Sequence, residues 1–236
     1  MKAYSVILLA AGQGKRMQAG KNKQFLSIAG TPLLIHTIRV FEGDSLCRHI
    51  QLVVNDQETE EIRELLREWE TGSKAVITTG GRERQDSVAA GLQQLRENDP
   101  RAVVMIHDAA RPFVQSGELH RLAEAAALHG GAILGAPVKD TIKEVEDGSI
   151  TKTTDRSRLW AAQTPQAFHD SVIRGAHEAA AAASYTGTDD ASLVEWHGGR
   201  VRMVQGSYEN FKVTTPEDLL FAEAVLKHRQ QGGRTT

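Results

Sequence analysis

Two glycines and several cations follow the first apolar stretch of the chain. The segment reads Leu9-Ala10-Ala11-Gly12-Gln13-Gly14-Lys15-Arg16-Met17, and Lys23-Gln24 comes shortly after it. Gly12 and Gly14 allow a tight turn in which successive backbone N–H groups can point at phosphate oxygens. Arg16 and Lys23 add positive charge to the same loop. We therefore predict a phosphate-binding loop, with a merely flexible glycine loop as the alternative.

This first loop also excludes two common nucleotide-binding classes. It matches neither G-x-x-x-x-G-K-[ST] nor G-x-G-x-x-G. The sequence therefore argues against a P-loop kinase and against a dinucleotide oxidoreductase.

A second glycine-rich segment, GGRERQDSV at residues 80–88, follows an apolar stretch and opens a predicted helix. The N-terminus of a helix offers free N–H groups and the positive end of its dipole. The segment is therefore suited to hold the edge of a base or a phosphate. For Ser87, the alternative is a hydroxyl that only caps the helix.

The third motif is His107-Asp108-Ala109-Ala110-Arg111-Pro112, at the carboxyl end of a predicted strand. Ligands of open α/β sheets bind at that edge. Asp108 could hold a ribose hydroxyl or a metal-bound water, and Arg111 could pair with Asp108 or with phosphate. We expect His107 to complete the strand rather than to do chemistry.

Further polar residues stand late in the chain: Thr141, Arg156, Thr188-Asp189 and Asn210-Phe211-Lys212-Val213-Thr214. Taken singly, each of them is best interpreted as a surface residue.

Alternating apolar and amphipathic stretches must position these motifs. The predicted strands cover residues 4–10, 49–54, 74–79, 102–107, 131–137 and 200–205. The predicted helices cover residues 32–42, 57–69, 85–96, 117–129, 171–183, 189–196 and 216–227. Continuous apolar runs such as VILLA at residues 6–10 lack a period of two, which is typical of strands buried on both faces. Right-handed crossovers then predict a Rossmann-like, doubly wound, mostly parallel α/β sheet.

Residues 138–160 break the alternation. They are polar and rich in β-branched residues, with Asp147-Gly148 in the middle. Asp-Gly between alternating segments is a strong hairpin signal. A hairpin with so little apolar surface should project from the domain as an arm; the alternative is an ordinary edge hairpin on the main sheet.

Composition limits the remaining choices. A chain of 236 residues suits one α/β domain, which we place over residues 1–236 with the arm inserted at 138–160. The net charge of −2 gives no reason to expect a nucleic-acid partner or an anionic membrane surface. The single Cys47 cannot form a disulfide within the chain, which fits a cytoplasmic protein. We expect no membrane span, and we expect the tail at 230–236 to be frayed.

Together the motifs resemble the 2-C-methyl-D-erythritol 4-phosphate cytidylyltransferase family of the non-mevalonate isoprenoid pathway. The resemblance runs from residue 6 to about residue 226. It rests on LAAGQGKRM, KQF, GGRERQDSV, HDAARP, PVKDT, TPQ at 164–166, TDDA at 188–191 and FKVTTPEDL at 211–219. Small departures are Asn22 before the lysine of the KQ motif, TDDA in place of a TDEA-like motif, and Arg82 at a position of varying type.

The resemblance implies a role for each matching residue. Cytosine would be held by Ala10, Ala11, Gly81 and Ser87, and the triphosphate by Gly12, Gly14, Arg16 and Lys23. The acceptor phosphosugar or the reacting phosphates would be held by Asp108, Thr141, Arg156, Thr188 and Lys212, with Arg84 and Arg111 bracing these loops. The resemblance also implies a homodimer whose arm is residues 138–160.

The implied reaction joins CMP from CTP to a polyol phosphate. A phosphate monoester is largely dianionic near neutral pH, so it needs no general base to attack the α-phosphorus. The task is to bring two polyanions together, for which Lys23, Lys212 and Arg16 are the expected catalytic cations. Mg²⁺ should bridge the phosphates with mostly phosphate and water ligands, and we assign it no protein ligand.

Three other functions stay open at this point. A ribitol 5-phosphate cytidylyltransferase would share the scaffold, but its relatives favour AGG and HDAVRP where this chain has AAG and HDAARP. A sugar-1-phosphate nucleotidyltransferase is disfavoured by GGRERQDSV. A nucleotide-binding regulator without catalysis would have to explain why Lys23 and Lys212 are both present.

Overall fold

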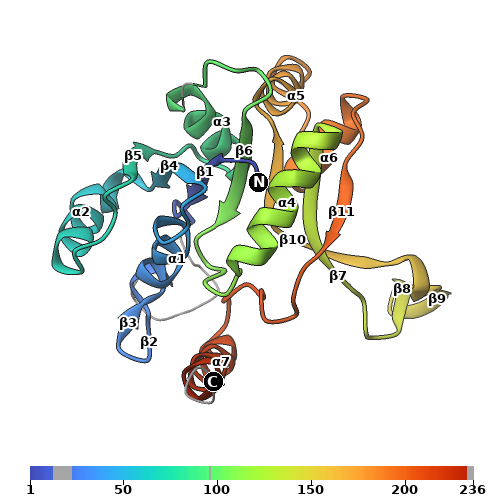
Figure 1. The fold of residues 1–236 in the computed structure, drawn as a ribbon. Coiled ribbons are helices and arrows are strands. Elements are labelled where there is room, and N and C mark those ends of the chain that lie inside the picture. Colours follow the sequence, from blue (N-terminus) through green and yellow to red (C-terminus); the bar gives the residue numbers. More distant parts are fainter. Residues whose placement is uncertain (13–22, 96, 233–236) are drawn as a thin grey trace.

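A seven-stranded sheet forms the centre of the molecule, with the strand order β11-β7-β10-β6-β1-β4-β5 (Figure 1). The computed structural model describes residues 1–12, 23–95 and 97–232. The strands are β1 (Tyr4–Leu9), β4 (Cys47–Val54), β5 (Ala75–Thr79), β6 (Val103–Asp108), β7 (Gly131–Pro137), β10 (Trp160–His169) and β11 (Arg202–Gln205). β10 runs antiparallel to both of its neighbours, and the other pairings in this sheet are parallel. The predicted mostly parallel sheet is confirmed.

Strand β10 was not predicted, and its sequence explains why. WAAQTPQAFH contains Pro165, which cannot donate a ladder hydrogen bond and normally argues against a central strand. The proline falls where the pairing with β7 shifts register, between Ala162 and Gln166. Pairing with β6 begins only at Gln166. A break in the ladder thus accommodates the proline inside the sheet.

Helices cover both faces of the sheet, as the doubly wound prediction requires. One face carries α1 (Leu33–Glu42), α2 (Thr59–Glu68) and α4 (Ser116–His129). The other carries α3 (Arg84–Gln94), α5 (Asp170–Ala182) and α6 (Asp190–Trp196). Val6 and Leu8 of β1 pack into the first core, whereas Ile7 packs into the second. The continuous apolar sequence of β1 therefore serves two buried faces.

The last helix, α7 (Pro216–Gly232), packs away from the sheet. It covers a small core with Ile28, Phe113 and Val213, beside the short pair β2 (Ser27–Ile28) and β3 (Thr31–Pro32). The helix continues through residues 230–232, so the expectation that the chain frays from residue 230 is wrong for these three residues. Within the described ranges, the structure contains no helix long and apolar enough to cross a membrane.

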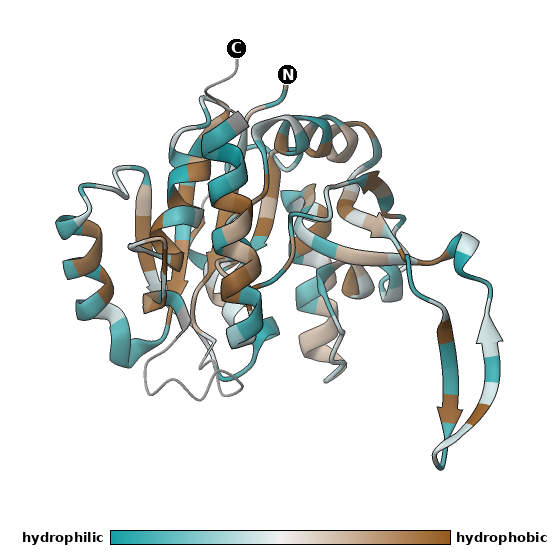
Figure 2. Ribbon diagram, turned by 90° about the horizontal axis from the view of Figure 1, so that it is seen from below, coloured by the Kyte–Doolittle hydropathy of each residue, from teal (hydrophilic) through white to brown (hydrophobic). Residues whose placement is uncertain are grey.

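The predicted arm is a separate hairpin of β8 (Ile142–Glu146) and β9 (Ser149–Thr154). Figure 2 shows it extending away from the packed layers. Asp147 and Gly148 form its turn with positive φ angles of 46° and 77°, which Asp and Gly tolerate best. The hairpin does not join the main sheet, which rules out the alternative of an edge hairpin.

Candidate active site

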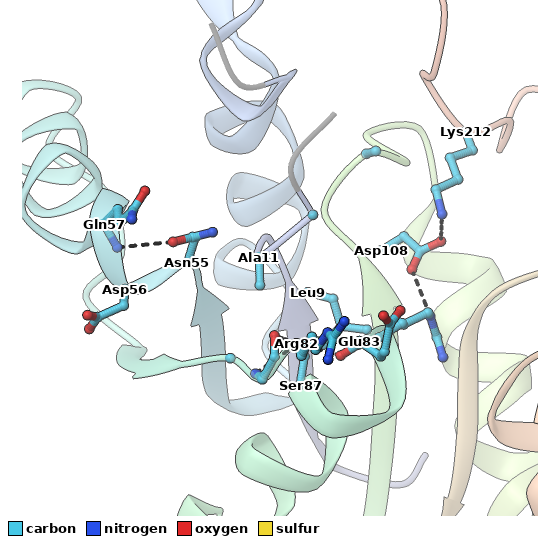
Figure 3. A pocket seen from close by; sticks show the side chains of 15 residues that line it. Leu9, Ala11, Asn55, Asp56, Gln57, Arg82, Glu83, Ser87, Asp108 and Lys212 are labelled. Atoms are coloured by element: carbon cyan, nitrogen blue, oxygen red, sulfur yellow. Dashed lines mark hydrogen bonds and ion pairs between the residues drawn. The ribbon is translucent and has the colours of Figure 1, made fainter. Parts of the chain in front are cut away.

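The main pocket opens at the carboxyl ends of β1, β4, β5 and β6 and has a volume of about 840 Å³ (Figure 3). The strand order places β1 between β4 and β6, so the chain crosses over in opposite directions on its two sides. Such a switch point is where open α/β sheets bind ligands. The predicted residues found in its walls are Ala11, Gly12, Gly81, Arg84, Ser87, Asp108 and Lys212.

One wall is the turn between β5 and α3. A Cβ atom on Gly80 would lie 2.8 Å from both the Ala11 Cβ and the Ser87 Oγ, so only glycine lets this turn approach the end of β1. The Gly81 N–H donates to Ser87 Oγ at 3.2 Å, and that hydroxyl donates to the Glu83 carbonyl at 3.0 Å. Ser87 therefore fixes the shape of the turn.

Ser87 is not the cap of α3. The cap residue is Glu83, whose N–H donates to the Asp86 carboxylate at 3.0 Å. The alternative interpretation of Ser87 as a capping hydroxyl is thus wrong.

Ala10 lies behind the pocket rather than in its wall. Its side chain is buried, its N–H donates to the Val53 carbonyl at 2.7 Å, and its carbonyl accepts from Gln24 Nε2 at 2.8 Å. Gln24 is itself buried and also donates to Glu58 at 2.6 Å. The Ala10 carbonyl keeps a second lone pair, so the expected contact between Ala10 and cytosine stays a prediction.

Asp108 is the electrostatic centre of the pocket floor. Its carboxylate lies 2.8 Å from Lys212 Nζ, 3.5 Å from Arg84 Nε and 3.9 Å from Arg111 Nε. Burial favours the neutral acid, but Lys212 and the two arginines outweigh it and hold the pKa of the Asp108 carboxyl well below its usual range. Asp108 is thus a permanent anion that gathers cations at the carboxyl end of β6.

Two hydrogen bonds fix the segment that carries Lys212. The Val213 N–H donates to the Ala110 carbonyl at 2.8 Å, and Arg111 Nη1 donates to the Asn210 carbonyl at 2.7 Å. The loop that carries Lys212 is therefore hydrogen-bonded to the loop after β6 on both sides of the lysine. These bonds hold the Lys212 ammonium beside Asp108.

Arg84 connects this cluster to α6. Its Nη2 lies 2.7 Å from the carboxylate of Asp190, which is 1 % exposed and also lies 3.2 Å from His177 Nε2. Burial opposes the charge on Arg84, but Asp190 and Asp108 raise its guanidinium pKa above the ordinary value. Burial likewise opposes ionisation of Asp190, and Arg84 lowers the pKa of that carboxyl. The arginine is therefore held charged between two carboxylates.

His107 is fully buried and supports the loop that follows β6. Its Nε2 lies 3.0 Å from the Arg111 carbonyl, so Nε2 must carry the proton, because a carbonyl only accepts. Nδ1 then accepts from the Thr164 hydroxyl at 3.1 Å, and the Thr164 oxygen in turn accepts from the Asp108 N–H at 3.0 Å. Burial lowers the pKa of His107 to about 4, so the ring is neutral at neutral pH.

The cluster favours an anionic ligand. Lys212, Arg84 and Arg111 outnumber the two carboxylates that they contact, Asp108 and Asp190. A net positive charge at the floor of a pocket raises the local concentration of phosphates and stabilises charge that develops on them.

Other predicted residues lie elsewhere. Thr141 and Arg156 stand at the base of the arm, where the Arg156 guanidinium donates to the Lys139 carbonyl, and Thr188 is exposed just before α6. None of the three lines this pocket. Gly14, Arg16 and the side chain of Lys23 lie outside the described residues.

Sequence reasoning missed one part of the pocket. Asn55, Asp56 and Gln57 line the wall opposite Asp108 (Figure 3). They directly follow the predicted strand at residues 49–54, so their position at a carboxyl end was the signal that could have found them.

The geometry of the pocket agrees with the comparisons with known proteins. The pattern of the family described as IspD, 2-C-methyl-D-erythritol 4-phosphate cytidylyltransferase, matches residues 4–228. A relative of that name from Halalkalibacterium halodurans is 53 % identical over 228 residues, which covers 97 % of this chain and 99 % of the relative. One from Geobacillus thermodenitrificans is 53 % identical over 226 residues, covering 96 % and 98 %.

Solved structures agree in fold over nearly the whole chain. The crystal structure of 4-diphosphocytidyl-2C-methyl-D-erythritol synthase from Anaerococcus prevotii superimposes with a TM-score of 0.82, at 30 % identity and 96 % coverage of both chains. The 2-C-methyl-D-erythritol 4-phosphate cytidylyltransferase from Thermus thermophilus gives 0.77, at 32 % identity, covering 96 % of this chain and all of that one. This chain therefore belongs to the 2-C-methyl-D-erythritol 4-phosphate cytidylyltransferase (IspD) family.

Proposed function

We propose that this chain transfers CMP from CTP to 2-C-methyl-D-erythritol 4-phosphate, giving 4-diphosphocytidyl-2-C-methyl-D-erythritol and pyrophosphate for isoprenoid precursor biosynthesis. Family membership supports the reaction. The observation that carries it in this chain is the cation cluster around Asp108, with Lys212 Nζ 2.8 Å from the carboxylate at the pocket floor. The glycine turn at Gly80-Gly81 lines the same pocket.

The chemistry needs cations more than bases. An oxygen of the acceptor phosphate forms a bond to the α-phosphorus of CTP, and the bond from that phosphorus to the oxygen bridging the α- and β-phosphates breaks. Pyrophosphate leaves with those electrons, and the attacking oxygen carries no proton that must be removed. Lys212 and Lys23 stabilise the charge that builds on the α-phosphate, and Arg16 holds the leaving phosphates.

In this proposal Asp108 orients the cations and accepts a hydrogen bond from a hydroxyl of the acceptor substrate. Because its carboxylate already faces Lys212 and two arginines, its first effect is to fix Lys212 Nζ before substrates arrive. Preorganised charge of this kind lowers the barrier without a cost of reorientation during the reaction.

We assign Mg²⁺ to the nucleotide rather than to the protein. Among the described residues there is no group of three His, Cys, Asp or Glu side chains that could hold a metal ion. Asp108 is a poor ligand because three cations surround it. These residues do not fit a protein-held metal, so in this proposal the ion arrives bound to the phosphates of CTP and to water.

The arm supports a homodimer. A two-stranded hairpin is marginally stable alone, and this one exposes Val145 by 59 % and Ile150 by 63 %. Its Thr141 and Arg156 do not line the pocket of their own chain. We propose that each arm brings these two residues to the acceptor site of a second subunit, where the guanidinium fork of Arg156 suits phosphate oxygens.

One assay tests the reaction. CTP, ATP, GTP and UTP are each offered with 2-C-methyl-D-erythritol 4-phosphate or with ribitol 5-phosphate, and pyrophosphate release is measured. We expect the fastest release with CTP and the methylerythritol phosphate, and with UTP a kcat/KM roughly tenfold to a hundredfold lower. Faster release with ribitol 5-phosphate would replace the acceptor, and no release with any pair would favour the regulator without catalysis.

A mixing experiment tests the shared site. Lys212→Ala and Arg156→Ala subunits are each expected to be inactive, and they are mixed, dissociated and reassociated. If Arg156 acts on its partner, each mixed dimer has one site with both faults and one intact site. Random pairing makes about half of the dimers mixed, so roughly a quarter of wild-type activity should return. No recovery, with mixed dimers confirmed by mass, would show that each arm serves its own subunit.

A further inference from the structure

Gln85 joins two segments that lie far apart in the sequence. It follows Arg84 at the start of α3, and its side-chain amide bonds the loop between α5 and α6 in both directions. Gln85 Nε2 donates to the Tyr185 carbonyl at 3.0 Å, and Gln85 Oε1 accepts from the Gly187 N–H at 3.1 Å. One amide therefore fixes two peptide groups on either side of residue 186.

The same loop is anchored from its other end. Gln166 of β10 donates to the Asp189 carboxylate at 2.7 Å and accepts from the Ala191 N–H at 3.0 Å. Asp189 in turn caps α6 by accepting from the Ser192 N–H at 2.9 Å. Thr188 therefore lies between a residue held by Gln85 and a residue held by Gln166.

Close packing leaves this loop little freedom. A Cβ atom on Gly187 would lie 2.6 Å from both Leu193 Cδ2 and Ser192 Oγ. At the start of the loop, the Tyr185 ring stacks on Trp196, with centroids 4.5 Å apart and planes 7° from parallel. Removing the Gln85 amide would release the polypeptide between these two packed points, where packing cannot replace the two lost hydrogen bonds.

We propose that Gln85 is a positioning residue that holds Thr188 in place for the acceptor substrate. The inference rests on the proposed function, in which Thr188 contacts the acceptor. Gln85 lies on the helix whose first turn carries Arg84 and Ser87 of the pocket wall. Gln85 therefore connects the loop between α5 and α6, which carries Thr188, to the nucleotide side of the site. It contacts neither substrate itself.

The test uses the full chain and a matched pair of variants on one helix. Gln85→Met keeps the length of the side chain and removes both hydrogen bonds, whereas Gln93→Met makes the same change at an exposed position of α3. The KM for CTP, the KM for 2-C-methyl-D-erythritol 4-phosphate and kcat are measured by pyrophosphate release, together with Tm.

For Gln85→Met we expect the acceptor KM to rise about tenfold, as two lost neutral hydrogen bonds would allow, with the CTP KM changing less than about threefold. Gln93→Met should match the wild type in both. Gly187→Ala displaces the same loop from the α6 side, so it should also raise the acceptor KM selectively. This variant replaces Gln85→Met in the test if Gln85→Met lowers Tm.

An unchanged acceptor KM in Gln85→Met, or an equal rise in both KM values, would overturn the inference. Wild-type protein that releases no pyrophosphate with this acceptor would instead refute the proposed function.

Discussion

Mild acid should destabilise this protein through His107. The ring is fully buried, and its two nitrogens are committed: Nε2–H donates to the Arg111 carbonyl, and Nδ1 accepts from the Thr164 hydroxyl. A second proton on Nδ1 would require the Thr164 hydroxyl to turn away and accept instead of donating, and it would place a charge in a fully buried site. Burial accordingly lowers the pKa of His107 from 6.5 to about 4.

The sign and size of the effect follow from linkage. In the unfolded chain the ring regains its ordinary pKa, so between pH 6.5 and pH 4 the unfolded state binds a proton that the folded state does not. The contribution of His107 to stability is fully present above pH 6.5 and declines as the pH falls toward 4. From pH 7 to pH 5 the loss is about 2 kcal/mol, given that one pKa unit is worth about 1.4 kcal/mol.

In this pH range the effect of His107 on stability can be distinguished from that of the buried carboxyl groups. The depressed carboxyl pKa values of Asp108 and Asp190 affect stability only as the pH falls below the ordinary carboxyl pKa of about 4. The free energy of unfolding of the wild type and of His107→Gln is measured with urea at pH 7 and at pH 5, at one protein concentration. The difference between the two proteins should shrink by about 2 kcal/mol at pH 5.

The control is His228→Gln, which changes an exposed histidine of α7. Its difference from the wild type should be the same at both pH values. If the wild type and His107→Gln also differ equally at pH 7 and pH 5, then His107 titrates normally and the tautomer argument is wrong.

Three further predictions concern the site. Lys212→Ala should lower kcat by about 10²-fold or more with its circular dichroism unchanged, and near-normal turnover would remove Lys212 from the catalytic set. CTP should be preferred to UTP by roughly tenfold to a hundredfold in kcat/KM, because backbone carbonyls of Ala10 or Gly81 that accept from the cytosine amino group would be left unpaired against UTP; equal values would refute the base assignment. Arg84→Met should lower the free energy of unfolding by roughly 3 kcal/mol, since it strands the buried Asp190 while a third of Arg84 is already solvated. A melting temperature unchanged from the wild type would contradict this.

Local sequence pattern predicted the regular elements well and the contacts between them poorly. The six predicted strands are present, and those at the centre of the sheet, such as β1 and β6, contain continuous apolar runs. β10 was missed because Pro165 and its polar neighbours disguise a buried strand. Positions at the ends of strands were predictable, which is why Asp108 and Gly81 fall in the pocket.

Contacts between distant side chains were not predictable in the same way. Nothing near Asp108 in the sequence indicates that Lys212 will lie 2.8 Å from its carboxylate. Nor does the local pattern show that the Ala10 carbonyl will accept a hydrogen bond from Gln24. Such pairings depend on the order of strands in the sheet, and an antiparallel strand hidden from the pattern changes that order.

The unpredicted strand also links the arm to the site. The arm leaves the sheet at Pro137 of β7 and returns to it at Trp160, where β10 begins. β10 then runs beside β6 and places the Thr164 hydroxyl between the Asp108 N–H and the His107 ring.

β10 also contacts the segment that carries Lys212 and the loop between α5 and α6. Asn210, two residues before Lys212, donates to the Thr164 carbonyl at 2.9 Å, and Gln166 holds the start of α6. Because one strand continues from the base of the arm into all three of these contacts, a second subunit that holds the arm would also steady the residues around Asp108. The dimer in our proposal would thus contribute rigidity to the site in addition to Thr141 and Arg156.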